Sequence, residues 1–217
     1  MRSRAAIAAL SVLLVPVLSA SAGAQAGRPA PVTRPAELVF VVAPNGNEAR
    51  YRVREQLVGF DLPNDAVGVT KDVTGRIVVG RDGKIVRYSS RIVVQVTGLK
   101  SDKTRRDGFL QKNTLETGKY PQVNLVPTTF EGLTETIPAG ATRTFSLVGD
   151  LTVRGVTHPT TWHVTAHGDG SDVVGSAETE FTFKDFALDQ PRVPVLLSVA
   201  DTIKLEYDFR FSPEANP

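Results

Sequence analysis

The stretch Leu147–Val164, LVGDLTVRGVTHPTTWHV, decides the fold, because it joins two runs in which apolar residues recur at alternate positions. Successive side chains of a strand point to opposite faces, so each run predicts a strand with one apolar and one polar face. Between the runs, Gly155–Pro159 predicts a reversal, since glycine tolerates a positive φ and proline has no N–H for a ladder. The whole stretch therefore predicts an antiparallel hairpin.

The rest of the chain repeats this pattern. Other alternating or β-branched segments predict strands at 38–42, 49–57, 74–79, 84–96, 122–126, 173–183 and 202–211. Ser101–Asn113 interrupts the pattern and predicts one short helix, capped by the side-chain oxygen of Ser101 or Asp102. Many alternating strands with a single helix predict an all-β protein, and composition alone leaves an antiparallel barrel and a sandwich open.

Several short motifs occur in an order and spacing that resemble those of one family. They are GDLTVRGVTHP at 149–159, RDGFL at 106–110, YP at 120–121, DFAL at 185–188 and VTGRI at 73–77. Together they resemble the signature of the YceI-like family, over roughly Tyr51 to Phe211. This chain departs from the family pattern at Ala187, where a glycine is usual, and at Thr114-Leu115, where an aromatic pair is usual.

The resemblance implies both a fold and a function. Members of this family are bacterial, mostly periplasmic, lipocalin-like proteins that bind polyisoprenoids and related lipids. The resemblance therefore favours an eight-stranded antiparallel lipocalin-like barrel with one short helix over a sandwich. Such a barrel either fills itself with side chains or holds one ligand.

The N-terminal region predicts export. Residues 1–26 combine Arg2 and Arg4 with an apolar run and several small-x-small sites, which is typical of a cleaved signal peptide. The apolar run is short for a membrane span of about 20 residues, so an uncleaved anchor is the less favoured alternative. Residues 27–36 predict a flexible proline-containing leader, and 37–213 the barrel domain. We expect a periplasmic or secreted protein with no stable membrane span.

Composition narrows the function classes. The chain has no cysteine, which excludes a disulfide, a thiol nucleophile and a thiolate metal site. Removing Arg2 and Arg4 from the 25 basic residues leaves 23, which equals the 23 acidic residues. A mature chain with no net formal charge gives no electrostatic reason to expect a nucleic-acid partner.

The apolar faces of the late strands predict the ligand-binding residues. In a barrel these faces point into the lumen, where they would line a channel for a long isoprenoid or acyl chain. Removing such a chain from water contributes about 0.8 kcal/mol per CH₂ group. The expected contacts are Phe145, Leu147, Trp162, Val164, Phe181, Phe183, Leu205 and Tyr207. We expect Arg106 and Tyr120, at the helix-bearing end, to orient a polar head group.

Catalytic and metal sites are not expected. His163 and His167 are four residues apart on a predicted strand, hence about 13 Å apart, and His158 lies in the predicted turn. No G-x-S-x-G elbow occurs. Asp107 and Asp185 adjoin cationic residues, and we expect capping or ion-pairing roles for them rather than acid–base catalysis. No cofactor is expected either.

The sequence therefore predicts an exported protein that carries or sequesters a polyisoprenoid, an isoprenoid quinone or another long-chain amphiphilic lipid. Two alternatives stay open. One is an enzyme acting on a lipid or isoprenoid on the same scaffold, and the other is a side-chain-filled, stress-related structural barrel. A homodimer is also left open.

The export hypothesis predicts a defined mature N-terminus. Cleavage should follow Ala24 or Ala26, because both end a small-x-small site behind the apolar run. N-terminal sequencing of material purified from a bacterial periplasm or culture medium measures this directly. Protein that still begins at Met1 would rule the hypothesis out.

Overall fold

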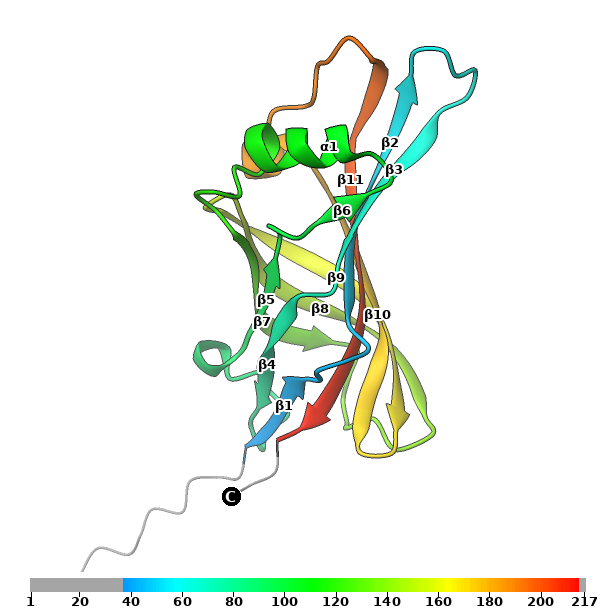
Figure 1. Ribbon diagram of the computed structural model, residues 1–217. Coiled ribbons are helices and arrows are strands. Elements are labelled where there is room, and N and C mark those ends of the chain that lie inside the picture. Colours follow the sequence, from blue (N-terminus) through cyan, green and yellow to red (C-terminus); the bar gives the residue numbers. More distant parts are fainter. Residues whose placement is uncertain (1–36, 215–217) are drawn as a thin grey trace, which may run out of the picture. The chain divides into compact units, whose positions relative to one another are not determined.

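The computed structural model describes residues 37–214, and Figure 1 shows them as one curved antiparallel sheet with a short helical segment. The predicted signal peptide (1–26) and leader (27–36) lie outside the described residues. The strands are β1 (Leu38–Val42), β2 (Glu48–Leu57), β3 (Asn64–Thr70), β4 (Val73–Val79), β5 (Arg91–Gln95), β6 (Lys100–Ser101), β7 (Gln122–Glu131), β8 (Thr142–Val153), β9 (Val156–Asp169), β10 (Asp172–Thr182) and β11 (Leu196–Pro213). The helical elements are η1 (Arg87–Ser89), α1 (Thr104–Phe109), η2 (Leu110–Thr114) and η3 (Phe183–Phe186).

These eleven segments form an eight-stranded barrel, because three of its strands are each interrupted once. β1 and β2 both pair with β11, β4 pairs with β1, and β3 pairs with β2. β5 and β6 continue the series by pairing with β4 and β3. From β5 the sheet passes through β7, β8, β9 and β10 back to β11, which closes the ring. The predicted eight-stranded antiparallel barrel is confirmed.

The breaks between β1 and β2, between β3 and β4 and between β5 and β6 lie beside one another, and backbone groups there find hydrogen-bond partners. Ala43 N–H donates to Arg210 C=O at 2.9 Å, and the Asn47 side-chain amide donates to Ala43 C=O at 2.7 Å. At the next interruption, the Thr70 hydroxyl donates to Gln95 C=O at 3.1 Å. Because buried backbone groups need partners, these bonds let the sheet bend here without losing closure.

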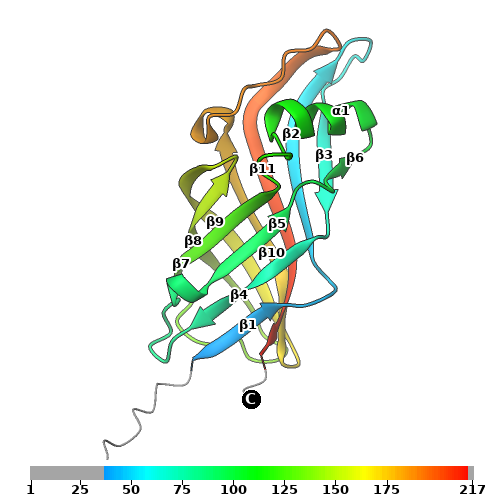
Figure 2. The same cartoon turned by 60° about the vertical axis from the view of Figure 1, so that its left-hand side comes forward.

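The helical segment connects β6 to β7 at the end of the barrel where the β2–β3 hairpin extends (Figures 1 and 2). It is shorter than the predicted 101–113 helix, since α1 begins at Thr104 and continues as a single wider turn, η2, to Thr114. The predicted cap at Ser101 or Asp102 is wrong. Ser101 belongs to β6, and both its N–H and its hydroxyl donate to the Asp107 carboxylate, which ties α1 to the sheet.

The predicted hairpin is present, but its turn is tighter than Gly155–Pro159. β8 and β9 are joined by Arg154 and Gly155 alone, with φ of +48° and +77°. Two consecutive positive φ values are typical of the turn that matches the twist of a two-residue hairpin. Pro159 therefore lies within β9, opposite Asp150, beyond the part of β9 that pairs with β10. Its missing N–H costs no ladder bond on that edge.

Other boundaries also differ from the predictions. The single strand predicted at 84–96 is a loop with the short η1 helix followed by β5. β7 runs on to Glu131 rather than ending at 126, and β11 begins at Leu196 rather than 202. β10 ends at Thr182, so that Phe183 starts η3.

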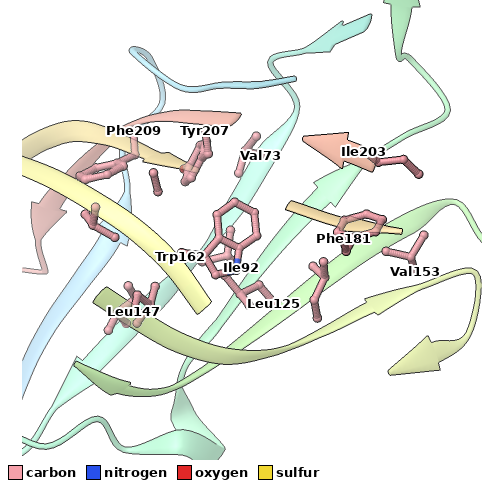
Figure 3. Close-up of a cluster of buried hydrophobic side chains, with 14 of the residues drawn as sticks. Val73, Ile92, Leu125, Leu147, Val153, Trp162, Phe181, Ile203, Tyr207 and Phe209 are labelled. Carbon is pink, nitrogen blue, oxygen red and sulfur yellow. The ribbon is translucent and has the colours of Figure 1, made fainter. Parts of the chain in front are cut away.

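Alternation fills the interior with apolar side chains. In β9, Trp162, Val164 and Ala166 are buried at 6%, 4% and 1% exposure, whereas the residues between them are exposed. Figure 3 shows Trp162, Leu125 and Phe181, from three different strands, turned into the space that the sheet encloses. Burial of one complete face of each strand is the main stabilising contribution to the barrel.

The geometry of the β8–β9 turn predicts that Gly155→Val destabilises the protein by about 1–3 kcal/mol, because a β-branched residue strains the backbone at positive φ. A Cβ atom at Gly155 would also lie 3.0 Å from the Tyr120 ring. Thermal unfolding measures the loss, at about 2–4 °C per kcal/mol for a domain of this size.

The matched control for this variant is Gly118→Val. Gly118 has no neighbouring atom within 4 Å of its ideal Cβ position and does not require a positive φ. Equal unfolding midpoints for Gly155→Val and Gly118→Val would contradict the assigned turn geometry.

Candidate functional site

The barrel encloses a cavity of about 940 Å³, which is the candidate functional site. This volume lies at the upper end of the roughly 300–1,000 Å³ that small-molecule sites occupy. All eight lumen residues predicted from the sequence line it: Phe145, Leu147, Trp162, Val164, Phe181, Phe183, Leu205 and Tyr207. Their contact with a ligand stays a prediction.

The four last strands bring these eight residues together. β8 supplies Phe145 and Leu147, and β9 supplies Trp162 and Val164 directly opposite them. Phe181 projects from β10, and Phe183 follows in η3, which folds back at that end of the sheet. Because cross-strand neighbours share a face, a single register places all of these side chains on the same wall.

The opposite wall comes from the first strands, which the sequence analysis did not include among the site residues. β1, β2, β4, β5 and β7 contribute Phe40, Ala49, Tyr51, Val53, Ile77, Val79, Ile92, Val94, Val123 and Leu125. The signal was present in the sequence, since Tyr51 and Val53 alternate with three arginines and Ile92 and Val94 recur at alternate positions. Leu110 and Leu115, from the helical segment and its end, also contribute to the lining.

Two aromatic side chains of the wall have their polar atoms satisfied by neighbouring residues. The Trp162 indole N–H donates to the Thr160 hydroxyl at 3.0 Å, and that hydroxyl donates to Gly149 C=O. The Tyr207 hydroxyl donates to the Asn47 side-chain oxygen at 2.8 Å, and burial raises the pKa of Tyr207. These rings therefore present mainly apolar surface to the cavity.

Two other cavity-lining hydroxyls have no such partner. Within residues 37–214, the Tyr51 hydroxyl and the Thr114 hydroxyl are the buried side-chain oxygens without a hydrogen bond. Leaving a buried polar group unpaired costs about 1–3 kcal/mol. Burial raises the pKa of Tyr51 to about 12, so its hydroxyl is protonated at neutral pH and can donate.

Arg106, predicted to orient a head group, lies at the helix-bearing end but is not among the cavity-lining residues. Its guanidinium binds the buried Glu55 carboxylate and the exposed Asp102 carboxylate. Burial works against the charge, but these two hydrogen bonds outweigh it and raise the pKa of Arg106. Arg106 therefore joins α1 to β2, and its head-group role stays a prediction.

Tyr120, the second predicted head-group residue, also lies outside the cavity lining. Its ring packs against Gly155 in the β8–β9 turn, and the Lys119 ammonium lies 4.9 Å from the ring centre. The helix end of the cavity is instead lined by Leu99, Leu110, Thr114 and Leu115. These residues were not among the predicted site residues, because a short helix after a series of strands gives little periodic signal for the face that it turns to the lumen.

The opposite end of the cavity is lined by polar loop residues. Asp82, Lys84 and Glu135 come from the loops after β4 and β7, and Asp172 is the first residue of β10. Their charges are compensated, since Lys84 lies 3.7 Å from Asp82, and two arginines pair with the other carboxylates. This end therefore combines polar groups with little net charge.

The candidate acid–base residues have structural contacts. Asp107 accepts the two hydrogen bonds from Ser101. Asp185 accepts the backbone N–H of Thr182 at 2.7 Å and its hydroxyl at 2.9 Å, and these bonds lower the pKa of Asp185. The Asp185 carboxylate therefore caps η3, as expected, whereas that of Asp107 ties α1 to β6 and makes no capping bond.

The histidines lie apart from the cavity lining. His158 is in β9 rather than in the turn, and its ring packs edge-on against Phe186 at 5.8 Å. His163 and His167 are exposed on the outer face of the same strand. Residues 37–214 contain no group of three His, Cys, Asp or Glu side chains placed to hold a metal ion. None of the helices in this range has the length and hydropathy needed to cross a bilayer.

Solved structures with the same fold support the barrel assignment. A polyisoprenoid binding domain from Saccharophagus degradans is 9% identical, with a TM-score of 0.63 over 81% of this chain and 98% of that one. BcnA from Burkholderia cenocepacia is 14% identical, with a TM-score of 0.55 over 76% and 95%. A YCEI protein from Campylobacter jejuni is 18% identical, with a TM-score of 0.55 over 74% and 94%.

Sequence comparison identifies the family. No curated protein matches the chain significantly. The family model of the YceI-like domain, however, matches residues 40–211, which covers the barrel from β1 to β11. The chain therefore belongs to the YceI-like family.

Proposed function

We propose that this protein is an exported binding protein that carries or sequesters a polyisoprenoid, an isoprenoid quinone or a similar long-chain amphiphile inside the barrel. The observation that carries the proposal is the cavity of about 940 Å³ with its apolar lining from both walls of the sheet. Each CH₂ group that leaves water for such a lining contributes about 0.8 kcal/mol, so a long chain gains affinity along its whole length.

The comparisons support the ligand class. The chain is a member of the YceI-like family, and the Saccharophagus degradans structure is described as a polyisoprenoid binding domain. Export is supported by residues 1–26, whose sequence is typical of a signal peptide.

The cavity favours this function over a side-chain-filled structural barrel, because a filled interior would leave no space of this size. The contacts of Asp107 and Asp185 favour it over an enzyme, since both carboxylates are engaged in local structure. A binding protein needs only an apolar cavity and a few polar groups.

A charge placed in the middle of the cavity should abolish binding. Val164 is 4% exposed and faces the cavity, so Val164→Glu introduces a buried carboxylate with no partner. The cost of burying an unpaired charge far exceeds the contribution of one CH₂ contact. Trp162, the one tryptophan of the chain, reports binding of an isoprenoid quinone by its fluorescence.

The matched control is Thr165→Glu, which places the same charge one residue further along, on the exposed outer face of β9. This variant should bind like the parent. Ala177→Phe provides a second loss-of-binding variant that adds no charge, since Ala177 lines the cavity and a larger ring occupies its volume. A parent protein that gives no fluorescence response and yields no lipid on solvent extraction would defeat the proposal.

A further inference from the structure

The two unpaired hydroxyls share one end of the cavity. Tyr51 and Thr114 both line the cavity, and their hydroxyls are the buried side-chain oxygens that lack a partner within residues 37–214. Thr114 is the last residue of η2 and is 4% exposed. Tyr51 pairs with Gly68 of β3, and Gly68 pairs with Ser101 of β6. Because the Ser101 hydroxyl donates to Asp107 of α1, the Tyr51 ring lies beside the start of the same helical segment.

The fold directs the Tyr51 ring to this position. Its ring crosses β3 at Gly68, where a Cβ atom would lie only 2.1 Å from the ring. Nearby Ser101 already donates its hydroxyl to Asp107 at 2.6 Å and accepts hydrogen bonds from Arg106 and Lys103. The Tyr51 hydroxyl lies beside this cluster, and the nearness of Ser101 counters part of the rise in its pKa that burial causes, but the geometry forms no hydrogen bond between them.

Thr114 has a similar arrangement. Its carbonyl oxygen accepts a hydrogen bond from Arg154 at 3.4 Å, whereas its hydroxyl is unpaired. Two such hydroxyls at one end of an otherwise apolar cavity are the kind of polar groups that fix the orientation of a ligand.

Two arginines beside these residues are already paired. Arg106 binds Glu55 and Asp102, and Arg154 binds Glu116 together with two backbone oxygens. A phosphate or carboxylate would thus have to displace an existing ion pair. The surroundings favour an oxygen that carries no charge.

We propose that the helix-bearing end of the cavity binds uncharged oxygen groups of the ligand, such as the carbonyls of an isoprenoid quinone or the hydroxyl of an isoprenoid alcohol, and that Tyr51 and Thr114 each offer a hydroxyl to such a group. This inference rests on the proposed function. The Tyr51 hydroxyl donates to the ligand oxygen, and the Thr114 hydroxyl donates to a carbonyl or either donates to or accepts from an alcohol. An isoprenoid diphosphate is disfavoured.

The test uses four probes: menaquinone with a geranylgeranyl side chain, geranylgeraniol, geranylgeranyl diphosphate and the hydrocarbon phytane. Binding of the quinone is followed by quenching of Trp162, and binding of the others by displacement of the quinone. Tyr51→Phe and Thr114→Val each remove one hydroxyl and keep the shape of the side chain. Each substitution should weaken the binding of the quinone and of the alcohol about three- to tenfold and leave the binding of phytane unchanged.

The control variants remove equivalent hydroxyls elsewhere. Tyr88 and Thr165 are exposed, so Tyr88→Phe and Thr165→Val should bind all probes like the parent. In the parent, the diphosphate should bind more weakly than the alcohol. A larger loss for the quinone than for the alcohol in Tyr51→Phe would identify a carbonyl as the natural partner, and the reverse would identify a hydroxyl.

Failure of the inference and failure of the proposed function give different results. If the parent binds phytane and the quinone equally well and neither variant changes this, water satisfies the two hydroxyls and the inference is wrong. Tighter binding of the diphosphate than of the alcohol would also overturn it. If Tyr51→Phe loses phytane binding as well, that substitution has damaged the cavity itself. The inference then depends on Thr114→Val, which must lose quinone and alcohol binding but keep phytane binding. A parent that binds none of the probes contradicts the proposed function itself.

Discussion

Closure of the sheet by β11 is the constraint on which the site depends. One edge of β11 pairs with β10, and the other pairs with β2 and then with β1. A closed sheet has one inner face, and side chains alternate strictly between the two faces, so pairing register decides which residues line the cavity. A slip of one residue would turn Trp162 outward and His163 inward. The two-residue turn between β8 and β9 fixes this register locally.

The interior is largely apolar, and most of its polar atoms have hydrogen-bond partners. Polar atoms of the wall form hydrogen bonds with neighbouring side chains, as the Tyr207 hydroxyl does with Asn47 and the Trp162 indole with Thr160. Charged side chains pair on the outer face, where Arg50 binds Glu48 and Asp208 along β2 and β11, and at the end of the cavity opposite the helix, where Arg143 binds Glu135 and Arg210 binds Asp172. Among residues 37–214, Tyr51 and Thr114 depart from this pattern, because their buried hydroxyls have no hydrogen-bond partner within the fold.

Prediction from the sequence succeeded where strand periodicity carried the information. The apolar positions of β8 to β11 identified one wall, because a period of two directly specifies a face. β2 has the same periodicity, but periodicity alone does not show whether an apolar face lines a cavity or packs in a filled core. The residues at the helical end were harder to predict. Arg106 has the charge expected of a residue that binds a head group, but its pairing with Glu55 depends on a contact between segments that are distant in the sequence. Tyr51 reaches this end only because Gly68 leaves room for its ring.

The pairing of β11 with both neighbours also sets the order in which the barrel can form. Val42 meets Phe211, and Leu57 meets Leu196, so the ring joins residues that are far apart along the chain. Such non-local pairing makes folding slow, since a long loop must close before the contacts can stabilise it. Hairpins such as β8–β9 can form early, but the cavity does not exist until the C-terminal strand is in place. The cavity is therefore complete only once β11 has paired with both of its neighbours, and a chain in which β11 is still unpaired exposes both cavity walls to solvent.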